Sequence, residues 1–277
     1  MSTETSPIPH WLQVARVTFL RDFRMAASYR TGFLLSYGGS LLNILGVFFL
    51  SRAVGPEIGV PLDRYGGDFF SFAVVGVAFS TFMSVGLTGI GSRIREGQMM
   101  GTLELLLLSP NRLATILFSS SLWGHTQAAL TLLVYLAAAM LLGMDVSRAN
   151  LPMALASTLL AVIAFNALGL LAASVVIVIK QGNPVSLVVG LGSVLLGGVL
   201  YPTSVLPGPL QALGQLLPLT HALELMRRSV LAGEGIDTLW SPFLSLAALT
   251  AVLLPLGLWA CGRAVHLAQT DGTLSQY

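Results

Sequence analysis

The stretch 149–179, ANLPMALASTLLAVIAFNALGLLAASVVIVI, contains no Asp, Glu, Lys or Arg, and it decides the fold class. A helix needs about 20 apolar residues to cross the hydrocarbon core of a bilayer, and this stretch exceeds that length. Such charge-free runs recur along the chain, at 31–51, 69–92, 113–144, 149–179, 181–223 and 238–262. The sequence therefore predicts an all-α, polytopic membrane protein.

The composition excludes several other classes of protein. Charged residues make up only 9% of the 277 residues, whereas a soluble globular domain carries about 25%. The chain holds one lysine, Lys180, and no basic cluster beyond paired arginines, so no nucleic acid is expected as a partner. The single cysteine, Cys261, leaves no intrachain disulfide and no cysteine-based metal site, and no metal is expected.

We expect a single transmembrane domain over 1–277, with six spans at about 32–52, 69–91, 113–142, 151–179, 185–202 and 240–262. An even number of spans places both termini on the same side of the membrane. If that side is cytoplasmic, nine Lys and Arg residues lie inside and five lie outside, which agrees with the positive-inside rule. The expected location is therefore the cytoplasmic (inner) membrane, with both termini cytoplasmic and the first span as a permanent anchor.

The segment before the first span, 9–30, carries too many charges to cross a bilayer. Trp11, Phe19 and Phe23 are separated by multiples of four residues, so they form an aromatic stripe along one side of a helix, and Arg16 and Asp22 blur this pattern. This moderate amphipathicity favours a helix that lies in the cytoplasmic interface. The alternative is a plain solvated leader.

The connection 92–112, SRIREGQMMGTLELLLLSPNR, is cytoplasmic in this orientation. Gly97 and Gly101 are expected to break the helix before it, and Pro110 is expected to stop the segment. Between them the pattern predicts a short helix over 102–109, whose first turn offers a capping hydroxyl and a carboxylate. Because this leucine-rich helix is too short to span, it either docks on the membrane or its own bundle, or inserts into a partner protein.

The connection before the last span, about 203–233, is external in this orientation and is interrupted by prolines. Proline breaks helix interiors, so we expect two short helices, about 209–217 and 220–232, rather than a seventh span. Thr220 is expected to cap the second helix and Gly233 to end it. A re-entrant helical hairpin is the expected structure, because it satisfies backbone groups internally at membrane depth.

Three charged residues lie on the second of these short helices. Glu224 precedes Arg227 by three residues and Arg228 by four, so both pairs are expected to form on one face of the helix. The arginines also lie near the helix C-terminus, where positive charge is favoured.

Four polar side chains lie within the predicted spans, namely Asn43, His125, Gln127 and Asn166. Such groups commonly hydrogen-bond between membrane helices. The alternative is that they line a substrate pathway. A proton relay is disfavoured, because no partner acid is evident for His125.

The chain shows no energy source of its own. A P-loop requires Gly-x-x-x-x-Gly-Lys-[Ser/Thr], and the only lysine, Lys180, does not stand in that context. No predicted span contains an acidic residue, which argues against the alternative of a self-sufficient secondary carrier or channel. We therefore expect a non-enzymatic membrane subunit driven by another polypeptide, which docks at 102–109 and at the turn Gln181-Gly182-Asn183.

Two motifs resemble those of a known family. The cytoplasmic one comprises Arg93-x-Arg95-Glu96-Gly97, Gly101-Thr102-Leu103-Glu104-Leu105-Leu106 and Ser109-Pro110. The external one comprises Leu206-Pro207, Pro218-Leu219-Thr220-His221, Glu224-x-x-Arg227 and Gly233. Together, at this spacing, they resemble the type-2 ABC exporter permeases, and the length is similar to that of bacterial drug, polysaccharide and lipo-oligosaccharide export permeases.

The resemblance implies a complex of two permeases and two separate P-loop ATPase subunits, which bind ATP and Mg. It implies that the ATPase moves a coupling helix matched to 102–109, and that the substrate follows the permease dimer interface along the first, second and fifth spans. The residues implied or expected to meet the ATPase are Glu96, Thr102, Leu103, Glu104, Leu105, Leu106, Gln181, Gly182 and Asn183. The chain itself is expected to hold no cofactor.

Overall fold

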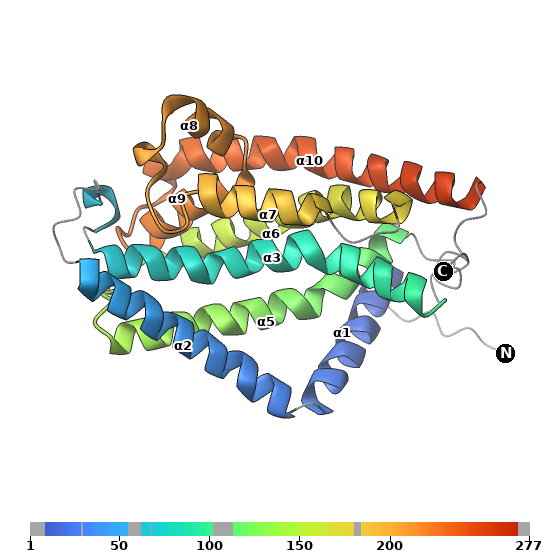
Figure 1. The fold of residues 1–277 in the computed structure, drawn as a ribbon, viewed down its shortest axis with the longest axis horizontal. Coiled ribbons are helices and arrows are strands. Elements are labelled where there is room, and N and C mark those ends of the chain that lie inside the picture. The colour runs from blue at the N-terminus through green and yellow to red at the C-terminus, as the bar shows by residue number, and fades with distance from the viewer. Residues whose placement is uncertain are drawn as a thin grey trace.

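The computed structural model describes residues 9–28, 30–54, 62–66, 68–101, 113–179 and 184–270. In these ranges every regular element is a helix, so the predicted all-α class is confirmed (Figure 1). The elements are α1 (His10–Ser28), α2 (Arg30–Val54), η1 (Asp63–Tyr65), α3 (Phe69–Met99), α5 (Leu113–Leu141), α6 (Leu151–Ile179), α7 (Pro184–Leu196), η2 (Thr203–Val205), α8 (Gly208–Gln215), α9 (Pro218–Val230) and α10 (Ile236–Thr270).

Within the described ranges, four helices are long and apolar enough to cross a membrane, namely α3, α5, α6 and α10. They overlap four of the predicted spans. α2 has 25 residues, which is the length of a span. The complete six-span topology stays a prediction.

The structure corrects the predicted span 185–202. α7 has 13 residues and ends at Leu196, so it is only about 20 Å long at 1.5 Å per residue. The chain leaves the helix at Gly197 and Gly198, and Gly198 has a φ of 77°, in the left-handed region that favours glycine. The turn carries the chain through η2 into the hairpin.

α3 and α6 form the centre of the bundle, and α10 packs along α6 (Figure 1). Phe79 of α3 and Phe165 of α6 are fully buried, with ring centroids 6.3 Å apart. About two turns further along α3 and one turn further along α6, the two backbones approach closely, because Gly86 and Gly169 lack side chains. A Cβ atom added at Gly169 would lie 2.0 Å from the carbonyl oxygen of Gly86.

The hairpin helices α8 and α9 lie close to the predicted ranges, and they gather with η1 at one end of the bundle, called here the hairpin end (Figure 1). Gly233 follows α9 with a φ of 71°. The predicted cap is wrong: Leu217 precedes the first turn, and the Thr220 hydroxyl instead donates to the carbonyl of Gly214, at 2.6 Å. That bond joins α9 to α8.

The opposite end of the bundle holds α1 and the last turns of α3 and α10 (Figure 1). Gly97 does not break α3, because it is buried within the helix, which continues to Met99. Gly101 follows with a φ of 66°. The predicted coupling helix 102–109 lies outside the described residues.

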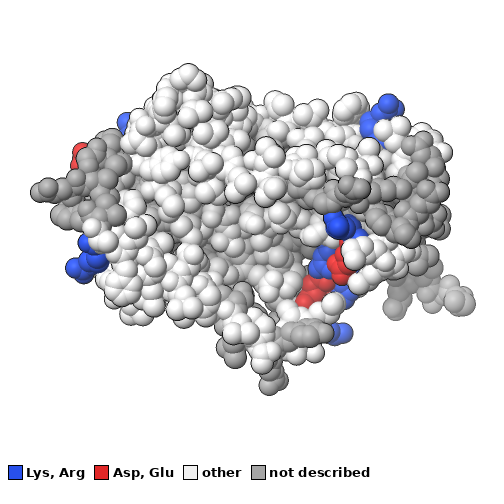
Figure 2. All heavy atoms as spheres, in the orientation of Figure 1, with Lys and Arg blue, Asp and Glu red and all other residues white. Residues whose placement is uncertain are grey.

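On the face shown in Figure 2, charged side chains gather near the hairpin end and, on the opposite half, around the place of α1 and the far end of the bundle, with a broad uncharged area between them. This distribution is typical of helices that cross a bilayer, because burial of a charge in hydrocarbon is costly. The chain is therefore a membrane protein, and the ends of the bundle hold its charged chemistry.

Candidate functional site

The hairpin end is organised around the side chain of Arg227, which is 3% exposed. Its guanidinium donates to the carbonyl oxygens of Phe72, Gly198 and Val199, at 3.1, 2.7 and 2.6 Å. It also stacks on the ring of Phe72, with Cζ 3.4 Å from the centroid. One side chain thus joins α9, α3 and the turn that follows α7.

The sequence makes room for this guanidinium at Gly76, one turn after Phe72 on α3. A Cβ atom at Gly76 would lie 2.4 Å from Nη2 of Arg227 and 2.1 Å from the carbonyl oxygen of Val199. Burial lowers the pKa of Arg227 to about 9, so the group stays protonated at neutral pH. The three carbonyl oxygens therefore accept from a charged donor, and such hydrogen bonds are stronger than those from a neutral donor.

The predicted pair of Glu224 with Arg227 does not form. Arg227 lies on the face of α9 that is buried in the bundle, whereas Glu224 and Arg228 share the half-buried face, with Arg228 Nη1 3.3 Å from Glu224 Oε1. Glu224 therefore pairs with Arg228, four residues later, and not with Arg227, three residues later, because the Arg227 side chain points into the bundle.

Arg228 also binds Glu234, in the loop after α9, with Nε 2.9 Å from Oε1. These hydrogen bonds lower the pKa of Glu234 and raise that of Arg228. On the other side of the network, the hydroxyl of Tyr65 in η1 donates to Glu224. Burial, and then the negative charge of Glu224, raise the pKa of Tyr65. The network therefore ties η1 to the hairpin.

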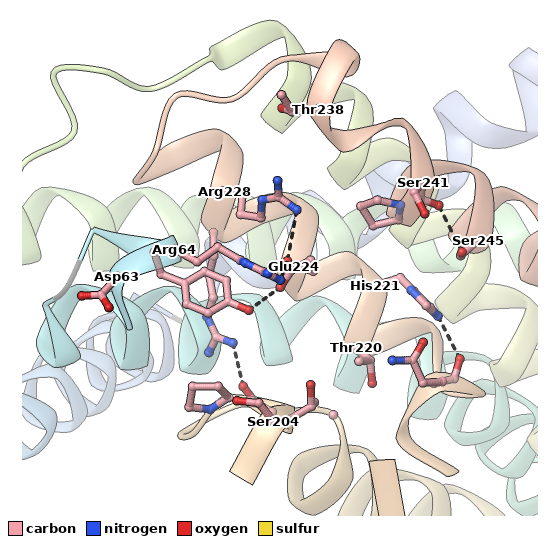
Figure 3. Close-up of a pocket in the computed structure, with 18 residues that line it drawn as sticks. Asp63, Arg64, Ser204, Thr220, His221, Glu224, Arg228, Thr238, Ser241 and Ser245 are labelled. Atoms are coloured by element: carbon pink, nitrogen blue, oxygen red, sulfur yellow. Dashed lines mark hydrogen bonds and ion pairs between the residues drawn. The ribbon is translucent and has the colours of Figure 1, made fainter. Parts of the chain in front are cut away.

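A cavity of about 610 Å³ lies beside this network. Figure 3 shows Arg64, Glu224 and Arg228 on one side of it, and His221, Ser241 and Ser245 on the other. The cavity is thus shared by η1, the segment after α7, the hairpin and the start of α10. Its size is that of a small-molecule site, which is about 300–1,000 Å³.

A second hollow, of about 530 Å³, lies between α3, α6 and α7. α3 contributes a row of hydroxyls spaced four residues apart, which therefore face one way: Ser80, Ser84, Thr88 and Ser92. Opposite them, α7 contributes apolar side chains, and Arg95 stands at one end. The groove combines an apolar wall with a polar stripe, which suits an amphiphile.

The polar residues predicted within the spans separate in the structure. His125 and Asn166 meet, with Asn166 Nδ2 3.3 Å from His125 Nε2, and His125 Nδ1 lies 2.9 Å from the carbonyl oxygen of Ser121. Asn43 is exposed on α2, and Gln127 is half-buried on α5. None of these four lines either hollow described above. His125 and Asn166 thus form an interhelical contact, as one of the two alternatives predicted.

At the opposite end, Asp22 of α1 is 4% exposed and binds Arg93 of α3, with Oδ2 2.8 Å from Nη2. Arg93 also lies 3.5 Å from the carboxylate of Glu96. α1 is further held to α5, because Phe19 and Phe23 both pack edge-on against Trp123. Asp22, which interrupts the apolar stripe in the sequence, is therefore turned toward the bundle by its ion pair.

Of the residues predicted to meet an ATPase, Glu96 is described, and its carboxylate is half exposed beside Arg93. The others, Thr102 to Leu106 and Gln181 to Asn183, lie outside the described residues. They follow and precede helix ends that the structure does place, since α3 ends at Met99, α6 at Ile179, and α7 begins at Pro184.

The sequence motifs missed Tyr65, Asp22 and the hydroxyl row of α3. Asp22 had a signal, namely an acid on the apolar side of an amphipathic helix. The hydroxyl row also had one, its regular four-residue spacing. No local pattern pointed to Tyr65, because its partner Glu224 lies far away in the chain.

Comparison with known proteins adds the family. A search of curated proteins finds no match. The model of the ABC-2 family transporter proteins matches residues 56–259, well over half of the chain. The match runs from the connection before α3 through both sequence motifs and into α10. The chain therefore belongs to the ABC-2 family of transporter proteins.

Proposed function

We propose that this chain is the permease subunit of an ATP-driven exporter, which moves an amphiphilic, lipid-linked or polysaccharide cargo out of the cytoplasm. The observation that carries the proposal is the family match over 56–259, because it includes both the connection 92–112 and the hairpin. The energy comes from separate P-loop ATPase subunits that bind ATP and Mg, since the chain has no P-loop lysine of its own.

In this proposal the end opposite the hairpin faces the cytoplasm, and the ATPase binds the chain at 102–109 and 181–183. The ion pair between Asp22 and Arg93 supports a mechanical role for this end. It links α1 to the last turns of α3, directly before the docking segment. A displacement of that segment would therefore be transmitted to both helices.

The groove beside α3 supports an amphiphilic cargo. Thr88 and Ser92 each donate their hydroxyl hydrogen to a carbonyl one turn earlier on α3, at 2.7 and 3.0 Å. Their oxygens remain able to accept hydrogen bonds from a ligand. Leu187 and Leu191 of α7 form the apolar wall and are 62% and 57% exposed. In a dimer of permeases, a second copy would close this groove into a pathway.

The proposal is tested by co-purifying the chain with its P-loop ATPase. Glu104→Arg reverses a charge in the proposed docking helix, and we expect it to reduce the ATPase recovered, and cargo-stimulated ATP hydrolysis, by about tenfold, a change of about 1.4 kcal/mol in binding. Membrane insertion should be unchanged. The matched control is Glu57→Arg, the same exchange in the connection before α3. Equal recovery and equal stimulation for the two variants would contradict the docking assignment.

A further inference from the structure

The cavity at the hairpin end has walls from four separate parts of the chain, at 63–65, 197–204, 215–228 and 238–245. It shares no lining residue with the groove beside α3. The ion pairs of Arg228 with Glu224 and Glu234 account for the charged residues on one wall. They do not explain the polar groups on the others.

Four of the five charged side chains that line the cavity are bound by other groups of the protein, and the fifth, Asp63, is exposed. Arg227 is surrounded by carbonyl oxygens and by Phe72. Arg228 is bound by Glu234 and by Glu224, which also accepts from Tyr65. Arg64, at the mouth, lies 3.8 Å from the same Glu224. An anionic ligand would have to compete with these partners for the three arginines, so the cavity does not favour an anion.

The remaining wall offers hydrogen-bonding groups that have no protein partner in the described part of the chain. They are the hydroxyls of Thr203, Ser204 and Ser241 and the side-chain amide of Gln215. His221 adds one more, because its Nε2 lies 2.8 Å from the carbonyl oxygen of Gln215, which leaves Nδ1 to accept a hydrogen bond. All of these face a space large enough for a ligand.

Hydroxyls and amides both donate and accept hydrogen bonds. A ligand that matches this uncharged surface carries closely spaced groups that both donate and accept hydrogen bonds. A saccharide has this property, and it can replace the waters on these groups without leaving a buried group unpaired. An acyl chain would satisfy none of them, and a phosphate group, which only accepts, would leave their acceptors without a donor.

We propose that this cavity binds a neutral, hydroxyl-rich group of the cargo, a saccharide unit. The inference rests on the proposed export function, in which the hairpin end is the external one. The cavity then holds the polar part of the cargo, while the groove beside α3 accommodates its apolar part.

The test measures binding without ATP or ATPase, so that it is independent of the docking experiment. The purified chain is placed in nanodiscs of phosphatidylglycerol, and saturation-transfer NMR is recorded with a panel of probes. The panel contains methyl glycosides of glucose, galactose, rhamnose and N-acetylglucosamine, together with maltotriose, phosphocholine and N-acetylglycinamide. Two exposed cavity residues are replaced in turn, as Ser241→Leu and Gln215→Leu. Ser147→Leu, at an exposed loop position outside the cavity, is the matched control.

We expect saturation transfer to at least one saccharide, reduced severalfold in both cavity variants and unchanged in the control. Size-exclusion profiles should be the same for all variants, because each replaced side chain is exposed. Transfer to no saccharide, equal transfer in the cavity variants and the control, or transfer only to phosphocholine or N-acetylglycinamide would each overturn the proposal. If Glu104→Arg still uncouples the ATPase in that case, the export function stands and the cavity assignment alone fails.

Discussion

Replacing Arg227 with methionine is expected to destabilise the protein by about 2–6 kcal/mol, because each of the two buried carbonyl oxygens left without a donor costs about 1–3 kcal/mol. Methionine has a similar length and fills much of the same space, but it cannot donate. The carbonyl oxygens of Gly198 and Val199 belong to an irregular turn, so they would lose their charged donor and remain buried. The measurement is the midpoint of thermal unfolding, followed by size exclusion of the heated protein.

Two further variants make the Arg227 experiment decisive. Arg64→Met removes an arginine from the same end, but its side chain is 68% exposed, so little change is expected. Arg227→Lys keeps the charge but replaces a planar fork by one ammonium group, which cannot reach all three carbonyls, so its midpoint should fall between the other two. Equal midpoints for Arg227→Met and Arg64→Met would show that Arg227 does not hold the hairpin in place.

Gly169→Ala is expected to have a comparable effect from the middle of the bundle, about 3 kcal/mol. The added methyl group would lie 2.0 Å from the carbonyl oxygen of Gly86, which is backbone and has no rotamer to change. α3 and α6 would have to separate, and the packing of Phe79 against Phe165 beside this contact would loosen. Membrane helices use small residues for such close approaches.

The matched control is Gly89→Ala on α3, where an added Cβ atom meets nothing within 4 Å. Since alanine favours a helix more than glycine does, this variant should be neutral or slightly more stable. The same thermal measurement compares the two. If Gly169→Ala unfolds at the temperature of Gly89→Ala, the close approach of the two helices is not required.

Local patterns in the sequence predicted the long helices and the two short helices of the hairpin. The charge-free runs fall on α3, α5, α6 and α10, and the prolines around 203–233 separate α8 from α9. Glycine within a helix has two structural outcomes, a break or a close packing contact, and local sequence does not distinguish them. Gly97 was expected to break α3, but it is buried inside the helix, which ends two residues later at Met99.

The candidate site could be predicted only in part, because its contacts join residues that are distant in the chain. The pair of Glu224 and Arg228 follows from helical spacing. The inward turn of Arg227 depends on carbonyls that α7 exposes only by ending at Leu196, and the length of α7 was predicted wrongly. Likewise, the approach of Gly86 to Gly169 has no Gly-x-x-x-Gly signature, because each helix contributes a single glycine to it.

The central claim is that this chain is a pathway whose work is done by a separate ATPase. The most direct measurement is transport of the cargo into sealed proteoliposomes that contain the chain alone or the chain with its ATPase. The account predicts accumulation against a gradient only when the ATPase and Mg-ATP are both present. Accumulation by the chain alone, driven by an ion gradient or without any nucleotide, would contradict it.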